Sequence, residues 1–172
     1  MQSMGCGSGA GERMKQGRTS RVAVKSWRLV RAGPQRQILV AEAVASLATA
    51  RLLLATRPFS DVAARLGNFS ARADDAPQTG EQRSARHERI AREVGWAVRA
   101  AAPWMPFRAL CLQQAIAARA MLRRRGIVSV LHLGAGPDDS RDLTAHAWLD
   151  AAGAKVTGYP VAPHIVEIGC FS

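Results

Sequence analysis

The sequence predicts an α+β fold in which helices come first and an antiparallel sheet follows. Apolar residues recur at helical spacing as far as Gly126, and short β-rich runs separated by turns come after it. With 172 residues, 48% of them hydrophobic, the chain is long enough for one globular domain with its own core. We therefore expect a tail at 1–25 and one domain at 26–172, with a helical part at 26–101 and a helix-plus-sheet part at 102–172.

The tail is rich in glycine, serine and basic residues and holds few large apolar ones, a composition that predicts disorder. It also lacks the apolar core of a signal peptide. The three cysteines, Cys6, Cys111 and Cys170, cannot all pair, and their spacing matches neither a metal motif nor a disulfide framework. We expect a reduced, cytoplasmic protein that needs no metal ion or other cofactor.

The net charge of +11 is compatible with a nucleic acid, an acidic membrane or an acidic peptide as partner. Aromatic residues make up only 5% of the chain and do not alternate with basic ones, so we expect no nucleic-acid partner. The apolar stretch Trp27–Arg57 raises the question of a membrane span. Glu42 and Arg51 leave only eight residues between them, whereas a span needs about 20 apolar residues. We expect a buried or half-buried helix and no membrane span.

The helical part is expected to contain two long helices and one short one. Gly33-Pro34 supplies a start for the first helix, and Phe59 and Leu66 supply core residues for the short one. Glycine, proline, serine and aspartate predict a loop at 68–82. The helices are expected within Trp27–Arg57, Pro58–Gly67 and Arg83–Ala101.

A further helix begins at or near Cys111. The segment before it contains Pro103 and Pro106, whereas the segment after it is rich in alanine and ends in arginines followed by Gly126. Unpaired backbone N–H groups at a helix N-terminus favour an anion and lower the pKa of a thiol. Cys111 is therefore a candidate nucleophile, and the alternative is a buried cysteine that acts as a small apolar residue.

After Gly126 the pattern predicts strands joined by turns. Gly134–Asp142 reads as a loop, and Gly153 favours a hairpin turn at Ala151–Ala154. The strands are expected at Ile127–Leu133, Thr144–Asp150, Lys155–Gly158 and Val166–Phe171.

A base for the thiol has to come from elsewhere in the chain. His87 lies in a charged helical segment and His164 follows a proline near the C-terminus. His132 and His146 each lie in a predicted strand, and the residue pattern alone does not choose between them. A hydrogen-bonded structural histidine remains the alternative for either one.

At these residues the sequence resembles a known family. The features run in order: Cys-Leu-x-x-Ala, a helix ending in Leu-Arg-Arg-Arg-Gly-Ile, a strand ending in Leu-Gly, and Ala-His-Ala-Trp-Leu-Asp before a glycine turn. They resemble the leader peptidases of lasso-peptide biosynthesis, which are cysteine proteases of the transglutaminase-like superfamily. The resemblance covers about Trp27–Phe171 and is specific over Trp104–Leu149. It implies a transglutaminase/papain-like core, with Cys111 as nucleophile, His146 as base and His132 as a core strand residue.

One departure from the family concerns the residue that orients His146. The superfamily usually completes its triad with an aspartate near Gly158, where this sequence has no carboxylate. Asp150 is the nearest later acid and a candidate third residue, although four strand residues span roughly 13 Å. A backbone carbonyl, or the amide of Gln113 or Gln114, is the alternative, since an imidazole needs only a partner that fixes its tautomer.

The resemblance also implies a function and its partners. We expect a cysteine peptidase that removes the leader from a ribosomally made precursor peptide, beside an ATP-dependent macrolactam cyclase. Because no extra domain is evident, we expect a separate leader-binding protein. The oxyanion donor would be the N–H of Cys111 or a nearby glutamine amide, and Trp148 would wall the site or fill the core. The alternatives are another transglutaminase-like amidase or acyltransferase, or a non-catalytic peptide-binding subunit.

Overall fold

The computed structural model describes residues 33–70, 85–137 and 142–172. The predicted tail at 1–25 and most of the predicted loop at 68–82 lie outside these ranges. The chain divides into two units after Ile38, and the description that follows concerns the second unit, Leu39–Ser172.

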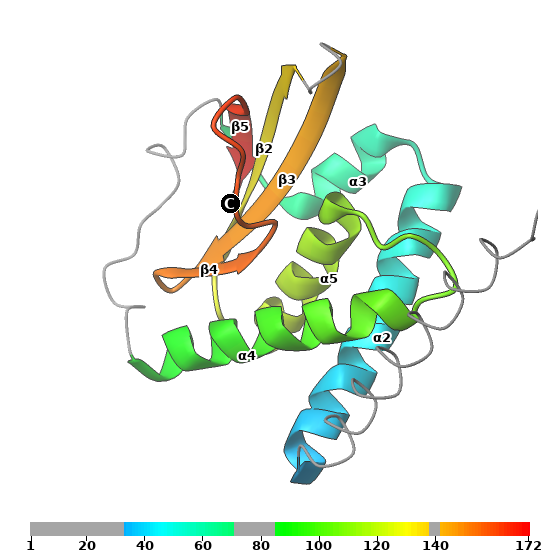
Figure 1. The fold of residues 1–172 in the computed structure, drawn as a ribbon, viewed down its shortest axis with the longest axis vertical. Coiled ribbons are helices and arrows are strands. Elements are labelled where there is room, and N and C mark those ends of the chain that lie inside the picture. The colour runs from blue at the N-terminus through cyan, green and yellow to red at the C-terminus, as the bar shows by residue number, and fades with distance from the viewer. Residues whose placement is uncertain (1–32, 71–84, 138–141) are drawn as a thin grey trace, which may run out of the picture. The chain divides into compact units, whose positions relative to one another are not determined.

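Helices precede an antiparallel sheet, so the predicted α+β class is confirmed (Figure 1). The sheet has the strand order β1-β5-β2-β3-β4, and every neighbouring pair is antiparallel. The helices are α2 (Gly33–Thr56), α3 (Phe59–Leu66), α4 (Ala85–Ala101) and α5 (Cys111–Arg123), with a 3-10 turn, η2, at Ala102–Trp104. The strands are β1 (Phe69–Ser70), β2 (Ser129–Pro137), β3 (Leu143–Ala151), β4 (Ala154–Thr157) and β5 (Val166–Phe171).

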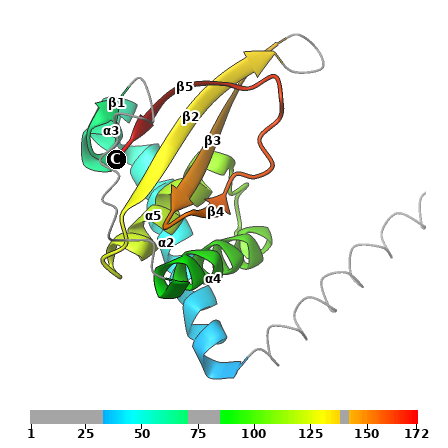
Figure 2. The same ribbon diagram turned by 90° about the vertical axis from the view of Figure 1, so that its left-hand side faces the viewer.

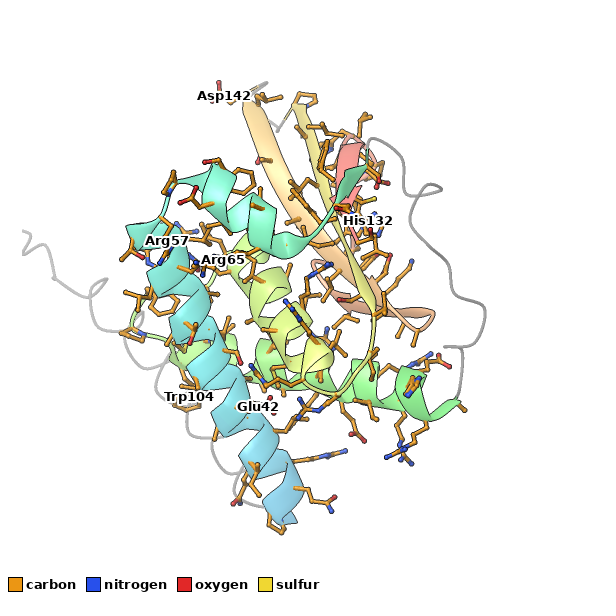
Figure 3. The ribbon with its side chains drawn as sticks, turned by 180° about the vertical axis from the view of Figure 1, so that it is seen from behind. Glu42, Arg57, Arg65, Trp104, His132 and Asp142 are labelled. Carbon is orange, nitrogen blue, oxygen red and sulfur yellow. The ribbon has the colours of Figure 1, made fainter. Side chains whose placement is uncertain are left out.

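The two faces of the sheet carry different residues, because successive side chains of a strand alternate between faces. Leu131 of β2 and Leu149 of β3 are cross-strand partners and are buried in the core with α4 and α5. Their neighbours His132 and Trp148 are also partners, and they project from the other face. Figures 1 and 3 show the sheet from opposite sides. In Figure 1 the connection between β4 and β5 lies in front of the sheet, and in Figure 3 helices α2 and α5 lie in front of it.

Arg119 ties α5 to three other elements. Its guanidinium donates hydrogen bonds to the carbonyls of Leu66 (2.6 Å), Ser129 (2.7 Å) and Phe171 (2.9 Å). These carbonyls lie at the end of α3, the start of β2 and the end of β5. Burial, and to a lesser degree the charge of Arg123, lowers the pKa of Arg119, but an arginine remains charged at neutral pH.

Helix α2 contributes one face to the same core. Ala43, Leu47 and Ala50 are buried, and Glu42 pairs with Arg124 (2.9 Å) and Arg125 (2.6 Å) beyond the end of α5. The hydrogen bond from Arg125 is the largest cause that lowers the pKa of Glu42. Among the described helices, α2 is the one whose length and hydropathy would suffice to cross a membrane, a test that core helices also pass.

Strand β2 continues through Gly134–Pro137, so the prediction of a loop from Gly134 was wrong for these residues. Glycine is needed at positions 134 and 136 because the segment at His164 and Ile165 packs against this part of β2. A Cβ at Gly134 would lie 2.7 Å from Ile165 Cγ2 and 2.9 Å from Trp148 Cζ3, and one at Gly136 would collide with the carbonyl of His164. Glycine here marks close packing in a strand and not a turn.

Other elements agree with the sequence to within a few residues, with two exceptions. Phe59, predicted as core, is 49% exposed at the first residue of α3, whereas Leu66 is buried as predicted and Val62 is buried with it. The short strand β1 lies inside the predicted loop, where the ring of Phe69 packs on that of Phe171 at 5.2 Å between centroids.

The packing at Gly134 predicts that Gly134→Ala lowers the free energy of unfolding by about 1–3 kcal/mol, the usual cost of overpacking. Gly126 provides the control, since its φ is +68° but a Cβ there meets nothing within 4 Å. Gly126→Asn should cost little, because asparagine tolerates the left-handed region. Denaturant unfolding measures both, and equal costs for the two variants would contradict the packing explanation.

Candidate functional site

Cys111 is the first residue of α5, as the sequence predicts. Leu110 precedes it with extended backbone and has no polar atom with which to cap the helix. Gln113 Oε1 accepts the N–H of Leu110 at 3.1 Å, and Gln114 Nε2 donates to the carbonyl of Ala109 at 2.7 Å. Both glutamine amides therefore hold the chain that leads into the helix.

The first turn of α5 has the properties of an anion site. No side chain caps its N–H groups, so they retain the partial positive charge of a helix N-terminus. Cys111 is half-buried and Cys170 is fully buried, so Cys111 is the more accessible of these two cysteines.

His146 lies in β3 and is held by a main-chain group. Its Nε2 is 2.6 Å from the carbonyl oxygen of Gly158. A carbonyl can only accept a hydrogen bond, so the ring carries its proton on Nε2 and the neutral ring leaves Nδ1 as an acceptor. Within the described ranges, no hydrogen bond is formed by Nδ1 of His146.

The geometry of Gly158 explains why no carboxylate stands at this position. Its φ is +81°, and a Cβ would lie 2.7 Å from Trp148 Cα and 2.8 Å from Trp148 Cβ. It would also collide with the carbonyl of Ala147. A side chain therefore does not fit, and the main chain itself comes close enough to reach His146. Of the orienting groups that the sequence left open, the structure has the backbone carbonyl.

Asp150 shares a strand face with His146 but bonds elsewhere. Both of its oxygens accept from the hydroxyl of Tyr159, at 2.8 and 2.7 Å, and Oδ2 lies 3.4 Å from His132 Nε2. In the described part of the chain it makes no hydrogen bond to His146, so Asp150 does not orient that ring directly.

His132 is buried, but it is more than the apolar-strand residue that the resemblance implied. Its Nδ1 lies 2.8 Å from Glu167 Oε1, and Asp150 lies on its other side. Burial disfavours the charged ring, but the hydrogen bonds to Asp150 and Glu167 outweigh it and raise the pKa of His132. His132 is labelled in Figure 3.

No cluster of three ligands suited to a metal ion is found in the residues that the structure describes.

Trp148 lies between the two histidines. Its ring stacks on that of His132 (5.4 Å between centroids, 2° between planes) and on that of His146 (6.1 Å, 22°). It is 7% exposed and lies outside the core shared with α4 and α5. Trp148 therefore fills the second face of the sheet and flanks His146 at the same time.

Helix α5 packs against β3 (Figure 1). It covers the face of Leu149, whereas the ring of His146 projects with Trp148 from the other face. Because β4 pairs only with Leu149–Ala151, β3 forms the edge of the sheet at His146. No hydrogen bond joins the thiol to the imidazole among the described residues. A direct contact between the two groups would have to form around the edge of the sheet at β3.

The raised pKa of His132 predicts how stability changes with pH. Its ion pairs contribute fully below the ordinary value of 6.5 and are lost as pH rises through the higher folded-state pKa. The difference in unfolding free energy between the wild type and His132→Gln should therefore shrink as the pH rises above about 6.5. Denaturant titrations would measure it, with His164→Gln as the exposed control. A difference that stays constant or grows with pH would contradict the charged state of His132.

Comparison with known proteins gives one match. Residues 52–166 match the model of the transglutaminase-like superfamily, and this range includes Cys111, His146 and Gly158. No curated protein and no solved structure matches the chain. The matched range covers more than half of the sequence, runs from within α2 to the start of β5, and has the α+β architecture described above. The chain therefore belongs to the transglutaminase-like superfamily.

Proposed function

We propose that this protein is a cysteine peptidase that removes the leader from a ribosomally synthesised precursor peptide in lasso-peptide biosynthesis. The observation that carries the proposal is the 2.6 Å contact between His146 Nε2 and the carbonyl of Gly158. It leaves Nδ1 of an oriented imidazole available as a base, at the edge of the sheet that β3 forms. The motif around these residues supplies the resemblance to leader peptidases.

In the first half of the reaction, His146 Nδ1 takes the thiol proton and Cys111 Sγ attacks the carbonyl carbon of the scissile bond. The new oxyanion lies near the N-terminus of α5, where the N–H of Cys111 can donate to it. The carbon–nitrogen bond then breaks, and the imidazolium returns its proton to the leaving amine. A thioester between Cys111 and the leader remains.

In the second half, His146 takes a proton from water, and the hydroxide attacks the thioester carbon. The thiol leaves and recovers its proton, and the leader is released with a free carboxylate. Throughout, the carbonyl of Gly158 keeps the Nε2 proton in place, so that Nδ1 is the nitrogen that gains and loses protons.

Substrate recognition is proposed to rest with other proteins of the same pathway. A separate leader-binding protein would hold the precursor and raise the local concentration of the scissile bond near Cys111, to about the mM range for a short tether. The shortened peptide would then pass to an ATP-dependent macrolactam cyclase. We propose that all of this takes place in the cytoplasm.

A second candidate is acyl transfer or amide hydrolysis on another substrate. The match to the superfamily as a whole favours it, because that match concerns the domain and not the substrate. The chemistry up to the thioester would be the same, and an amine would replace water in the transferase. Mass spectrometry of the products separates the two, since hydrolysis adds water and transfer adds the amine.

Cys111→Ala should reduce cleavage of a lasso precursor peptide by more than about a thousandfold, since the nucleophile is lost. Its unfolding free energy should stay close to that of the wild type. In the wild-type protein, iodoacetamide should alkylate the half-buried Cys111 before the fully buried Cys170, as peptide mapping by mass spectrometry would show. Undiminished cleavage by Cys111→Ala would end the peptidase proposal.

His146→Ala should reduce cleavage about as severely, because it removes the base that serves both halves of the reaction. His132→Ala should lose stability and only a small part of its activity when assayed where it is folded. Steady-state rates and unfolding curves for the two variants make the comparison. If the His132 variant is folded and inactive while the His146 variant is active, the base has been assigned to the wrong histidine.

A further inference from the structure

The segment that follows β4 has two ties to β3. One is the hydrogen bond from His146 to the carbonyl of Gly158, and the other is the hydrogen bond from the hydroxyl of Tyr159 to Asp150. The ladder between β3 and β4 ends at the pair Leu149 and Thr157. Beyond that pair, the described hydrogen bonds between this segment and β3 are these two ties.

The two ties act on one peptide group. The carbonyl of Gly158 and the nitrogen of Tyr159 belong to the same planar unit, which rotates only as a whole. Fixing the side chain of Tyr159 therefore restricts where the carbonyl of Gly158 can point. Glycine at 158 supplies little restraint of its own, because it has the widest choice of backbone angles.

Asp150 is well placed to hold Tyr159. The ring of His132 lies 3.4 Å from Asp150 Oδ2 and is itself bound to Glu167 on its other nitrogen. The ammonium of Lys155 lies 5.0 Å from the centre of the Tyr159 ring. Burial first, and then the bond to Asp150, raises the pKa of Tyr159, so the hydroxyl remains a donor. Asp150, His132 and Glu167 come from β3, β2 and β5, whereas Lys155 of β4 lies over the ring of Tyr159 and takes no part in this chain of contacts.

From these contacts we propose that Tyr159 and Asp150 are positioning residues. They hold the Gly158–Tyr159 peptide so that its carbonyl accepts the Nε2 proton of His146, and they thereby take over indirectly the part of a triad carboxylate. The inference deepens the proposed function, because it treats His146 as the catalytic base. Neither residue touches the thiol or the substrate in this account.

The experiment uses Tyr159→Phe, which removes the hydroxyl and keeps the ring, in the full-length protein. The first readout is the exchange of the His146 Nε2 proton with solvent, observed by NMR on protein labelled with nitrogen-15. A hydrogen-bonded ring proton exchanges slowly, and it should exchange at least several-fold faster in the variant. The second readout is precursor cleavage, for which kcat should fall about tenfold with little change in KM. This loss is a fraction of the rate enhancement of about 10²–10⁴-fold that general acid–base catalysis contributes.

Three further variants separate positioning from stability. Asp150→Ala should behave as Tyr159→Phe does, and the double variant should add nothing, because both changes break one bond. Asp150→Asn keeps an oxygen that can accept from Tyr159 and should be affected less. Lys155→Met removes the ammonium over the ring but keeps the hydrogen bond, so both readouts should match the wild type. Unfolding curves establish that each variant is folded at the assay temperature.

The outcomes distinguish this inference from the proposed function. If wild-type protein cleaves the precursor while Tyr159→Phe and Asp150→Ala keep both the slow ring-proton exchange and kcat, positioning is overturned and the peptidase stands. If no cleavage is observed but the ring proton exchanges faster in both variants, positioning is upheld and the peptidase fails. If either variant does not fold, the exchange rate of the His146 ring proton is compared between Asp150→Asn and Lys155→Met. A faster rate in Asp150→Asn supports positioning, and equal rates in the two variants would overturn it.

Discussion

The hydrogen bonds of Arg119 hold together the parts of the molecule on which the site depends. One guanidinium in the middle of α5 binds carbonyls at the end of α3, the start of β2 and the end of β5. A charged donor makes stronger hydrogen bonds to such main-chain groups than a neutral donor does. The position of Cys111 along the sheet follows from this anchor, because Cys111 lies two helical turns before Arg119 on the same rigid helix.

Close approach of the main chain determines the opposite face of the sheet. The absence of a side chain at Gly134 lets Ile165 and Trp148 pack close to the strand. The absence of one at Gly158 lets its main chain approach the backbone of β3 at Trp148. The result is a layer in which Trp148 separates two histidines with different surroundings. His132 lies between carboxylates and gains a raised pKa, whereas His146 has a neutral carbonyl as its partner. The same strand pair thus holds one histidine between two carboxylates and one that is bonded to a main-chain carbonyl.

Much of the fold was predictable because local signals agree with it. Alanine-rich helical spacing, the arginines and Gly126 located α5, and the period-two runs located the last strands to within a few residues. The carbonyl that contacts His146 was not predictable beyond being one of several options, since a main-chain group leaves no mark in the sequence. Gly134 was misread because a glycine needed for packing looks like a glycine needed for a turn. The partners of Asp150 come from Tyr159 and His132, which only the tertiary structure brings together.

A carbonyl that orients a base has one property that a carboxylate lacks. A carboxylate near an imidazole gains a proton in acid and then ceases to be an acceptor of the same strength, whereas the carbonyl of Gly158 has no proton to gain. The carbonyl also adds no negative charge beside the ring, so it favours the imidazolium less than an aspartate would. The group that fixes the Nε2 proton of His146 is therefore part of the main chain and does not itself titrate.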